Sequence, residues 1–186
     1  MKYYLSILIN LVMLIKISNA QLVNANELKA EYLLNLEKSI CISWPEDDLR
    51  KNFVIGIFST RDPKSNPVAL FLEKKVKAKN INRTSKLVIK YIDKISENGF
   101  NDCKMIFIIN ETEKSKLSEI FKYTQTKHIL TVGDNIKDFC ILGGHINITL
   151  ASEKQFQINI ANMDLSQLRA SPGFIYLCER IKESKR

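Results

Sequence analysis

The sequence predicts an α/β fold: a mixed, mostly parallel sheet, covered by helices on both faces and ending in a late antiparallel hairpin. Short apolar runs of strand length alternate with helical patterns, which is typical of strand–helix–strand units. Phe53–Phe58 is a short apolar run of strand length, and Met105–Ile109 is continuously apolar, as expected for a strand buried on both faces. Near the end, His145–Leu150 and Gln155–Ile160 are separated by one short loop, which favours a hairpin.

The remaining elements are expected from periodicity and from residues that start or stop helices. A first helix over Asn26–Ser39 places apolar side chains on one face and ends before Pro45, since the residue before a proline avoids the helical region. Pro67 can begin the next helix, and Ser171 can cap a closing helix over Pro172–Glu183. Further predicted elements are strands at Leu87–Ile92 and Ile129–Val132, a helix at Glu113–Tyr123, and short helical or turning segments at Asn135–Ile141 and Ser166–Ala170.

Residues 1–20 are typical of a secretory leader. Lys2 gives a short positive start, and the apolar run Leu5–Ile15 follows it. Small residues occupy the −3 and −1 positions of a cleavage site, so we expect cleavage after Ala20. An uncleaved membrane anchor is the alternative, but the run is shorter than the ~20 residues of a spanning helix, and Lys16 interrupts it.

The rest of the chain, residues 21–186, is expected to form one exported domain in the periplasm. It contains no repeat and no linker rich in Pro, Gly or Ser. The full sequence has 28 basic and 20 acidic residues, a net charge of +8, and most of the excess is scattered lysine. Nucleic-acid binding is not expected, because arginine is sparse and aromatic residues are not interleaved with the basic ones.

The exported domain has four cysteines, and an oxidising compartment permits disulfides among them. They are Cys41, Cys103, Cys140 and Cys178. Three complete pairings are open, and some of these cysteines can instead be small buried apolar side chains. The cysteines form no C-x-x-C motif and only two histidines could join them, so we expect no metal site.

No catalytic or cofactor motif stands out. The six glycines form neither a dinucleotide-binding nor a phosphate-loop pattern, and no G-x-S-x-G elbow occurs. We therefore expect no enzyme and no cofactor. An exported hydrolase built on His128 or His145 is the remaining enzymatic alternative, and it requires one of them to reach a Ser, a Cys or an acid in a cleft.

Asp134 and Arg169 are the two candidate ligand-binding residues. Asp134 ends a predicted buried strand, and ligands of open α/β sheets gather outside that edge. The alternative role of Asp134 is to cap the short segment that follows it. Arg169 can hold an anion through a bidentate fork, or can pair with a carboxylate such as Asp134 or Asp164. These two residues also define an alternative function, a periplasmic small-ligand binding protein.

The chain resembles the YfiR family of small exported bacterial regulators. The resemblance rests on the order and spacing of short motifs over nearly all of residues 21–186. They are Lys29-Ala30 to Tyr32-Leu33, Asn35, Trp44-Pro45, Phe53–Phe58, Asp102-Cys103, Leu130–Asp134, Phe139, Gly143-Gly144, Ile146-Asn147, Phe156, Ile158-Asn159, Leu168-Arg169 and Leu177.

The resemblance implies a periplasmic repressor that is not an enzyme. It would bind the periplasmic sensor domain of a membrane-bound diguanylate cyclase, or of another sensor such as a kinase, and so control cyclic-di-GMP and biofilm formation. A homodimer and a role for disulfides are also implied. The chain departs from the family pattern at Gly133, where serine is usual, and at His145, where a large apolar residue is usual. Cys103 lies where the family often has a cysteine, whereas Cys41 and Cys178 do not match the pattern.

Overall fold

The computed structural model describes residues 25–38, 40–45, 52–79, 86–150 and 153–181. The expected leader and its cleavage site lie outside the described residues. A first helix occupies residues 25–36. The strands are β1 (Ile42–Ser43), β2 (Phe53–Phe58), β3 (Leu87–Ile92), β4 (Cys103–Ile108), β5 (Leu130–Asp134), β6 (Ile146–Ile148), β7 (Phe156–Ile158), β8 (Arg169–Ala170) and β9 (Cys178–Arg180). The later helices are η1 (Pro63–Ser65), α2 (Pro67–Lys79), α3 (Glu97–Phe100), α4 (Lys114–Thr124), α5 (Ile160–Leu165) and α6 (Pro172–Leu177).

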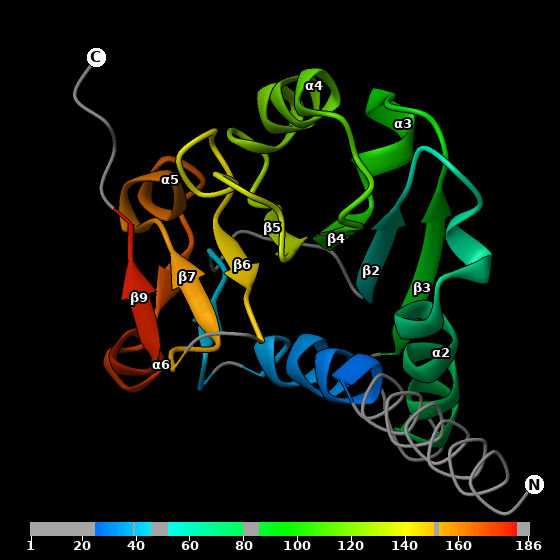
Figure 1. The fold of residues 1–186 in the computed structure, drawn as a ribbon, viewed down its shortest axis with the longest axis horizontal. Coiled ribbons are helices and arrows are strands. Elements are labelled where there is room, and N and C mark those ends of the chain that lie inside the picture. The colour runs from blue at the N-terminus through cyan, green and yellow to red at the C-terminus, as the bar shows by residue number, and fades with distance from the viewer. Residues whose placement is uncertain (1–24, 39, 46–51, 80–85, 151–152, 182–186) are drawn as a thin grey trace, which may run out of the picture.

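The strands form a seven-stranded sheet in the order β3-β2-β4-β5-β6-β7-β9 and a two-stranded sheet of β1 and β8. The five strands from β3 to β6 pair in parallel, and β7 then pairs antiparallel with β6. The predicted mixed, mostly parallel sheet with a late antiparallel hairpin is therefore confirmed. Figure 1 shows α3 and α4 on one side of the sheet, with the first helix and α2 on the other.

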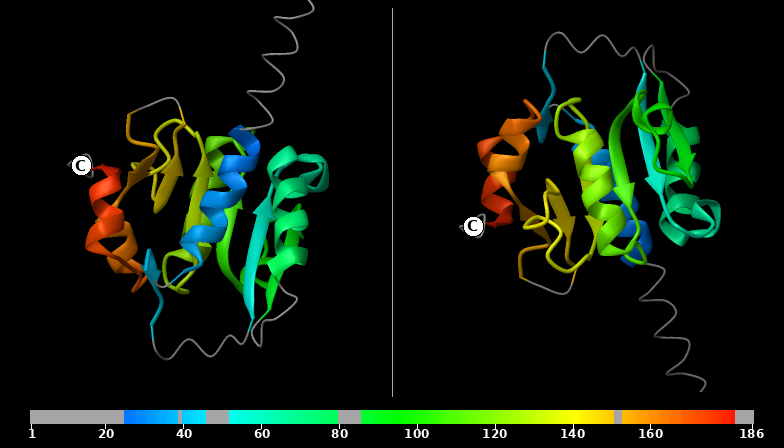
Figure 2. Two further views of the ribbon diagram at one scale, coloured as in Figure 1. Left: turned by 90° about the horizontal axis from the view of Figure 1, so that it is seen from below. Right: turned by 90° about the horizontal axis from the view of Figure 1, so that it is seen from above.

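Each face of the sheet has its own apolar core, because neighbouring residues of a strand point to opposite faces. In β4, Met105 and Phe107 belong to the core under the first helix and α2, whereas Ile106 and Ile108 belong to the core under α3 and α4. This double burial explains why β2 and β4 are continuously apolar in sequence. The two views of Figure 2 show the first helix lying across one face of the sheet.

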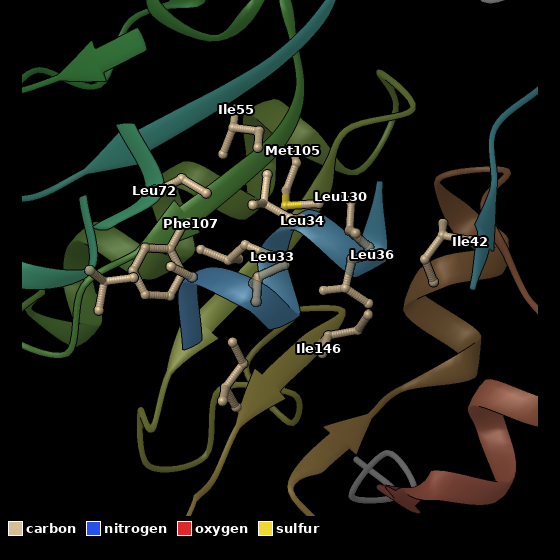
Figure 3. Packing of buried hydrophobic residues seen from close by; sticks show 14 of the residues in the cluster. Leu33, Leu34, Leu36, Ile42, Ile55, Leu72, Met105, Phe107, Leu130 and Ile146 are labelled. Carbon is tan, nitrogen blue, oxygen red and sulfur yellow. The ribbon is translucent and has the colours of Figure 1, made fainter. Parts of the chain in front are cut away.

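The first helix is held mainly by its leucines. Leu33 and Leu34 are fully buried, and Leu36 is nearly so. Figure 3 shows them among the side chains of Met105, Phe107, Leu130 and Ile146 from the strands. Burying a leucine stabilises a fold by about 1.5–3 kcal/mol relative to its exposed state, so this helix is an integral part of the core.

The predicted closing helix over Pro172–Glu183 is wrong in its second half. Ser171 does cap the helix, because its side chain accepts a hydrogen bond from the backbone N–H of Phe174. The helix ends at Leu177, and residues 178–180 form β9, which pairs in parallel with β7. Pairing with β9 covers the otherwise open edge of β7 and buries Cys178, and neither gain is visible in local sequence.

The segment after β7 also differs from expectation. Ile160 begins α5 instead of ending the hairpin strand, and Asn159 caps that helix by accepting a hydrogen bond from the N–H of Asn162. The segment predicted as helical or turning at Ser166–Ala170 is a turn followed by β8. β8 pairs antiparallel with β1, and this small sheet joins residues far apart in sequence.

Candidate functional site

An open cavity of about 790 Å3 lies beside the two-stranded sheet. The pairing of β1 with β8 sets Ser43 opposite Arg169, and this register brings the segment after β1 alongside the one predicted anion-binding residue. The cavity is lined by Ser43, Trp44, Pro45, Asp164, Gln167, Leu168 and Arg169. We call it the Arg169 cavity.

The aromatic wall of the Arg169 cavity is fixed in place. The Trp44 ring meets the Phe53 ring edge to face, with 5.1 Å between ring centroids. Its indole N–H donates a hydrogen bond to the backbone oxygen of Lys104 at 3.4 Å. A guanidinium and an indole on one cavity can recognise an anion that carries a planar or apolar body, because Arg pairs with carboxylates and phosphates and Trp supplies a flat apolar surface.

Another wall of the Arg169 cavity is formed by the end of α5 and the turn that follows it. The chain leaves the helix through Gln167, which has a φ of 57°, a left-handed conformation that is uncommon for a residue with a side chain. Two hydrogen bonds hold this turn: the N–H of Gln167 donates to Asp164 O at 2.9 Å, and the N–H of Leu168 donates to Met163 O at 2.9 Å. Leu168 is fully buried and anchors the turn.

A buried polar network fastens α5 to the sheet behind this wall. His145 accepts a hydrogen bond at Nδ1 from the backbone N–H of Thr131 at 2.9 Å. The Nε2–H of the same ring therefore points to Asn162 O at 3.1 Å and to Ser166 Oγ at 2.9 Å. Ser166 in turn donates its hydroxyl hydrogen to Gln125 O at 3.0 Å. Every polar atom of the imidazole has a partner, as buried polar groups require.

The contact between His145 and Ser166 bears on the hydrolase alternative, which requires a histidine to reach a serine, a cysteine or an acid in a cleft. One histidine does reach a serine, but both side chains are fully buried and neither lines the Arg169 cavity. Burial lowers the pKa of His145 to about 4, so the ring is neutral at pH 7 and its single proton is already donated. The nitrogen that faces the serine carries that proton and cannot accept another. His128 instead makes a 3.0 Å contact from Nδ1 to Ser166 O.

Asp134 lies at the C-terminal end of β5, as predicted, but away from Arg169. Its carboxylate oxygen Oδ1 lies 2.5 Å from Nζ of Lys29 on the first helix, and the two side chains are 10% and 16% exposed, respectively. That oxygen accepts no backbone hydrogen bond among the described residues. Asp134 does not line the Arg169 cavity, so the structure does not bring the two predicted site residues together.

Asn147 takes over the capping role that Asp134 was one candidate to play. Its side chain accepts a hydrogen bond from Ile136 N at 3.0 Å and donates one to Ile136 O at 2.9 Å. The same loop carries Phe139, whose ring lies against Gly144. A Cβ on Gly144 would lie 2.2 Å from Phe139 Cε1, which explains this glycine by close approach.

All four cysteines are free thiols in the structure, and three of them are buried. Burial raises the pKa of Cys140 and of Cys178 to about 12, so these thiols are almost wholly protonated at neutral pH. Cys41 is only partly buried. Any disulfide among the four stays a prediction. Within the described part of the chain, His, Cys, Asp and Glu side chains do not gather in threes as a metal site would require.

Sequence reasoning missed Trp44 and Gln167 as lining residues of this cavity. It uses Trp44 as part of a helix stop and of the family resemblance, whereas it does name Asp164 as a possible partner of Arg169. A Trp-Pro pair directly after a helix is a weak signal for a cavity wall, since proline only restricts the residue before it. The β1–β8 pairing that unites them is long-range, and two-residue strands leave no periodic pattern to detect.

None of the helices in the described ranges has both the length and the apolar character that a bilayer-spanning helix requires. A model of the YfiR/HmsC-like family matches residues 26–178, which is most of the 186-residue chain. No curated protein matches the chain significantly. Members of this family are periplasmic regulators rather than enzymes, and the family implies interaction with a membrane signalling partner. The chain belongs to the YfiR/HmsC-like family.

Proposed function

We propose that this chain is a periplasmic repressor of a membrane-bound signalling protein of the diguanylate cyclase type, and that it binds the sensor domain of that protein. The family match over residues 26–178 carries the proposal. The contact between His145 and Ser166 is consistent with a binding role, because both side chains are fully buried and the ring nitrogen that faces the serine is a donor.

Repression follows from differential binding. A regulator that binds the inactive conformation of a sensor more tightly than the active one shifts the population toward the inactive state. Moving a two-state equilibrium from 1:99 to 99:1 takes about a 10⁴-fold difference in affinity, which a protein-sized interface can supply. Release then requires a signal that weakens this contact, such as a small ligand or a redox change.

We place the contact with the sensor domain on the surface of α5 and α6. Leu165, Tyr176 and Leu177 are large apolar side chains on these helices, with exposed fractions of 62%, 80% and 57%. Figure 1 shows the two helices at the same end of the sheet, next to β7 and β9. Apolar and aromatic side chains of this kind anchor protein interfaces once a partner removes them from water.

A deletion strain tests the proposal in the cell. We expect deletion to raise cyclic-di-GMP and biofilm mass, and the wild-type gene to reverse both. Tyr176→Ser together with Leu177→Ser should fail to restore repression, whereas Leu70→Ser on α2 should restore it. Leu70 is a matched control, because it is 55% exposed and lies on a helix that covers another part of the sheet.

Capture of the partner is the complementary measurement. The purified domain should retain a membrane protein with a periplasmic sensor domain, identified by mass spectrometry. Capture of a sensor kinase would keep the repressor role and change the class of partner. Unchanged cyclic-di-GMP in the deletion strain, together with no captured sensor, would contradict the proposal.

Export and assembly belong to the same proposal. We expect the mature protein to begin at Gln21 and to fractionate with the periplasm, which N-terminal sequencing of the native protein measures. We expect a homodimer in solution, which light scattering coupled to gel filtration measures. A retained leader would contradict the expected cleavage, and a monomer at micromolar concentration would contradict the dimer.

A small-ligand binding protein is the second candidate function, and the Arg169 cavity favours it. The cavity is within the range of small-molecule sites, about 300–1,000 Å3, and joins a guanidinium to an indole. Thermal-shift screening against nucleotides and amino acids tests this function. A ligand of this cavity should raise the melting temperature of the wild type and not that of Arg169→Gln, and flat curves across the panel would leave it without support.

A further inference from the structure

The strand order of the large sheet reverses between β2 and β4. After β2 the chain passes to α2, whose Val68 and Leu72 belong to the core on one face. After β4 it passes to α4, whose Leu117 and Ile120 belong to the core on the opposite face. Adjacent parallel strands whose outgoing connections lie on opposite faces leave a crevice at their C-terminal ends, and ligands of doubly wound sheets bind there.

A second cavity, of about 370 Å3, opens beside this reversal point. It is lined by Phe58, Thr60, Asp93, Lys94, Ile95, Lys116 and Glu119. These residues come from the end of β2, the segment after β3 and the helix α4. We call it the switch-point cavity. It shares no residue with the Arg169 cavity.

The base of the switch-point cavity is tied to its neighbours by backbone hydrogen bonds. The N–H of Ser59 donates to Ile92 O at 3.3 Å, and the N–H of Ile109 donates to Phe58 O at 3.1 Å. The ends of β2, β3 and β4 are thereby held together. Phe58 is almost fully buried, so its ring is part of the core below the cavity. A site built on fixed strand ends holds its lining groups in place before a ligand arrives.

The charged side chains that line this cavity are unpaired in the part of the chain that the structure describes. In the described structure Asp93, Lys94, Lys116 and Glu119 make no side-chain hydrogen bond or ion pair. Neighbouring charges are paired: Arg61 lies 3.2 Å from Glu111, Lys90 lies 3.6 Å from Asp102, and Lys114 lies 3.2 Å from Asp138. Two ammonium and two carboxylate groups therefore remain available around one cavity.

We propose that the switch-point cavity binds a small zwitterion, a molecule that carries one ammonium and one carboxylate, as a free α-amino acid does. Lys94, Lys116 and the Thr60 hydroxyl can donate hydrogen bonds to the carboxylate, and Asp93 and Glu119 can accept them from the ammonium. A purely anionic ligand would face the two carboxylates, and a purely cationic one would face the two ammonium groups. Only a ligand with both charges satisfies both pairs.

Direct titration of the purified mature protein tests this proposal without any signalling partner. The probes are the common α-amino acids, with propionate and propylamine as ligands that carry one charge each. We expect calorimetric binding of at least one amino acid and of neither control. Lys94→Gln with Lys116→Gln, and separately Asp93→Asn with Glu119→Gln, should each weaken that binding by about tenfold or more, because each pair removes charge-assisted hydrogen bonds.

Two matched variants complete the test. Lys122→Gln removes an exposed lysine of α4 that does not line the cavity, and it should leave the affinity unchanged. Arg169→Gln should also leave it unchanged, since Arg169 lines the other cavity. The four substituted charges are exposed, so the variants should keep the wild-type melting temperature to within about a degree or two.

Several results would overturn the inference. They are no binding of any amino acid at about 10 mM, equal binding of the single-charge controls, full affinity in both double variants, or loss of binding in Arg169→Gln. The test is independent of the repressor role, because a zwitterion can bind a protein whose partner is not a cyclase, and a repressor can lack this ligand.

Discussion

His145 and Ser166 are joined by a 2.9 Å contact between Nε2 and Oγ, and both side chains are completely removed from solvent. In an open cleft such a pair would suggest nucleophilic catalysis. Here the ring accepts from the Thr131 N–H and donates toward Asn162 O, while the serine donates to Gln125 O. The pair thus connects β5 and β6 to the end of α5, which forms one wall of the Arg169 cavity.

The folded protein should become less stable as the pH is lowered, because of His145. Burial lowers the pKa of this ring to about 4, below its ordinary value of 6.5, so the folded state favours the neutral form. The folding stability that the neutral ring contributes is complete above pH 6.5 and is lost as pH falls toward 4. The unfolding free energy should decrease by up to about 1.4 kcal/mol per pH unit in this window. Urea unfolding at pH 7.5, 6 and 5 measures it.

His145→Gln provides the control for that slope. The amide keeps hydrogen-bonding capacity but does not titrate, so the variant should be less stable at pH 7.5 and should lose less stability between pH 6.5 and 5. An equal slope in the variant and the wild type would mean that other groups cause the pH dependence.

Gly144→Ala should destabilise the domain through Phe139. The added methyl would lie 2.2 Å from Phe139 Cε1, so the ring or the loop must move. We expect a loss of about 1–3 kcal/mol, the usual range for overpacking, measured by urea unfolding. Gly173→Ala is the matched control, because a Cβ there meets no atom within 4 Å and alanine favours the helix α6. Equal effects of the two substitutions would show that close approach does not explain Gly144.

Lys29→Met should cost more stability than an ordinary surface substitution. The change leaves the Asp134 carboxylate mostly buried and without its cation, and breaking a buried pair costs about 3–5 kcal/mol. Lys90→Met breaks a longer and more exposed pair with Asp102, so it should cost about 1 kcal/mol or less. Adding Asp134→Asn to Lys29→Met should recover part of the loss. Denaturant midpoints of the variants measure these differences, and an equal cost at both lysines would contradict the prediction.

Alkylation should separate Cys41 from Cys140 and Cys178. Cys41 is partly exposed and should react first with iodoacetamide, whereas Cys140 and Cys178 should react only on unfolding, since burial raises the pKa of each to about 12. Time-resolved mass spectrometry of the native reduced protein gives the order. Early modification of Cys140 would contradict its burial. Non-reducing peptide mapping of the periplasmic protein decides whether any two cysteines pair during export.

The local sequence pattern was enough to predict much of the sheet. The runs Phe53–Phe58 and Leu87–Ile92 are strands within the same bounds in the structure, and the hairpin partners are correct although shorter than predicted. The failure at Pro172–Glu183 has a specific cause. Residues 178–180 continue a helical pattern locally, but pairing with β7 satisfies their backbone and buries Cys178. Such pairing depends on contacts far apart in sequence.

The sequence by itself determined the class of fold and the family, because apolar periodicity and ordered motifs are properties of neighbouring residues. Only the tertiary structure decided which polar residues meet. It buried His145 beside Ser166, paired Asp134 with Lys29 instead of Arg169, and brought Trp44 and Arg169 to the same cavity through two short strands. These outcomes depend on burial and long-range register, which decide whether a charged or polar group finds water, a partner or a cavity.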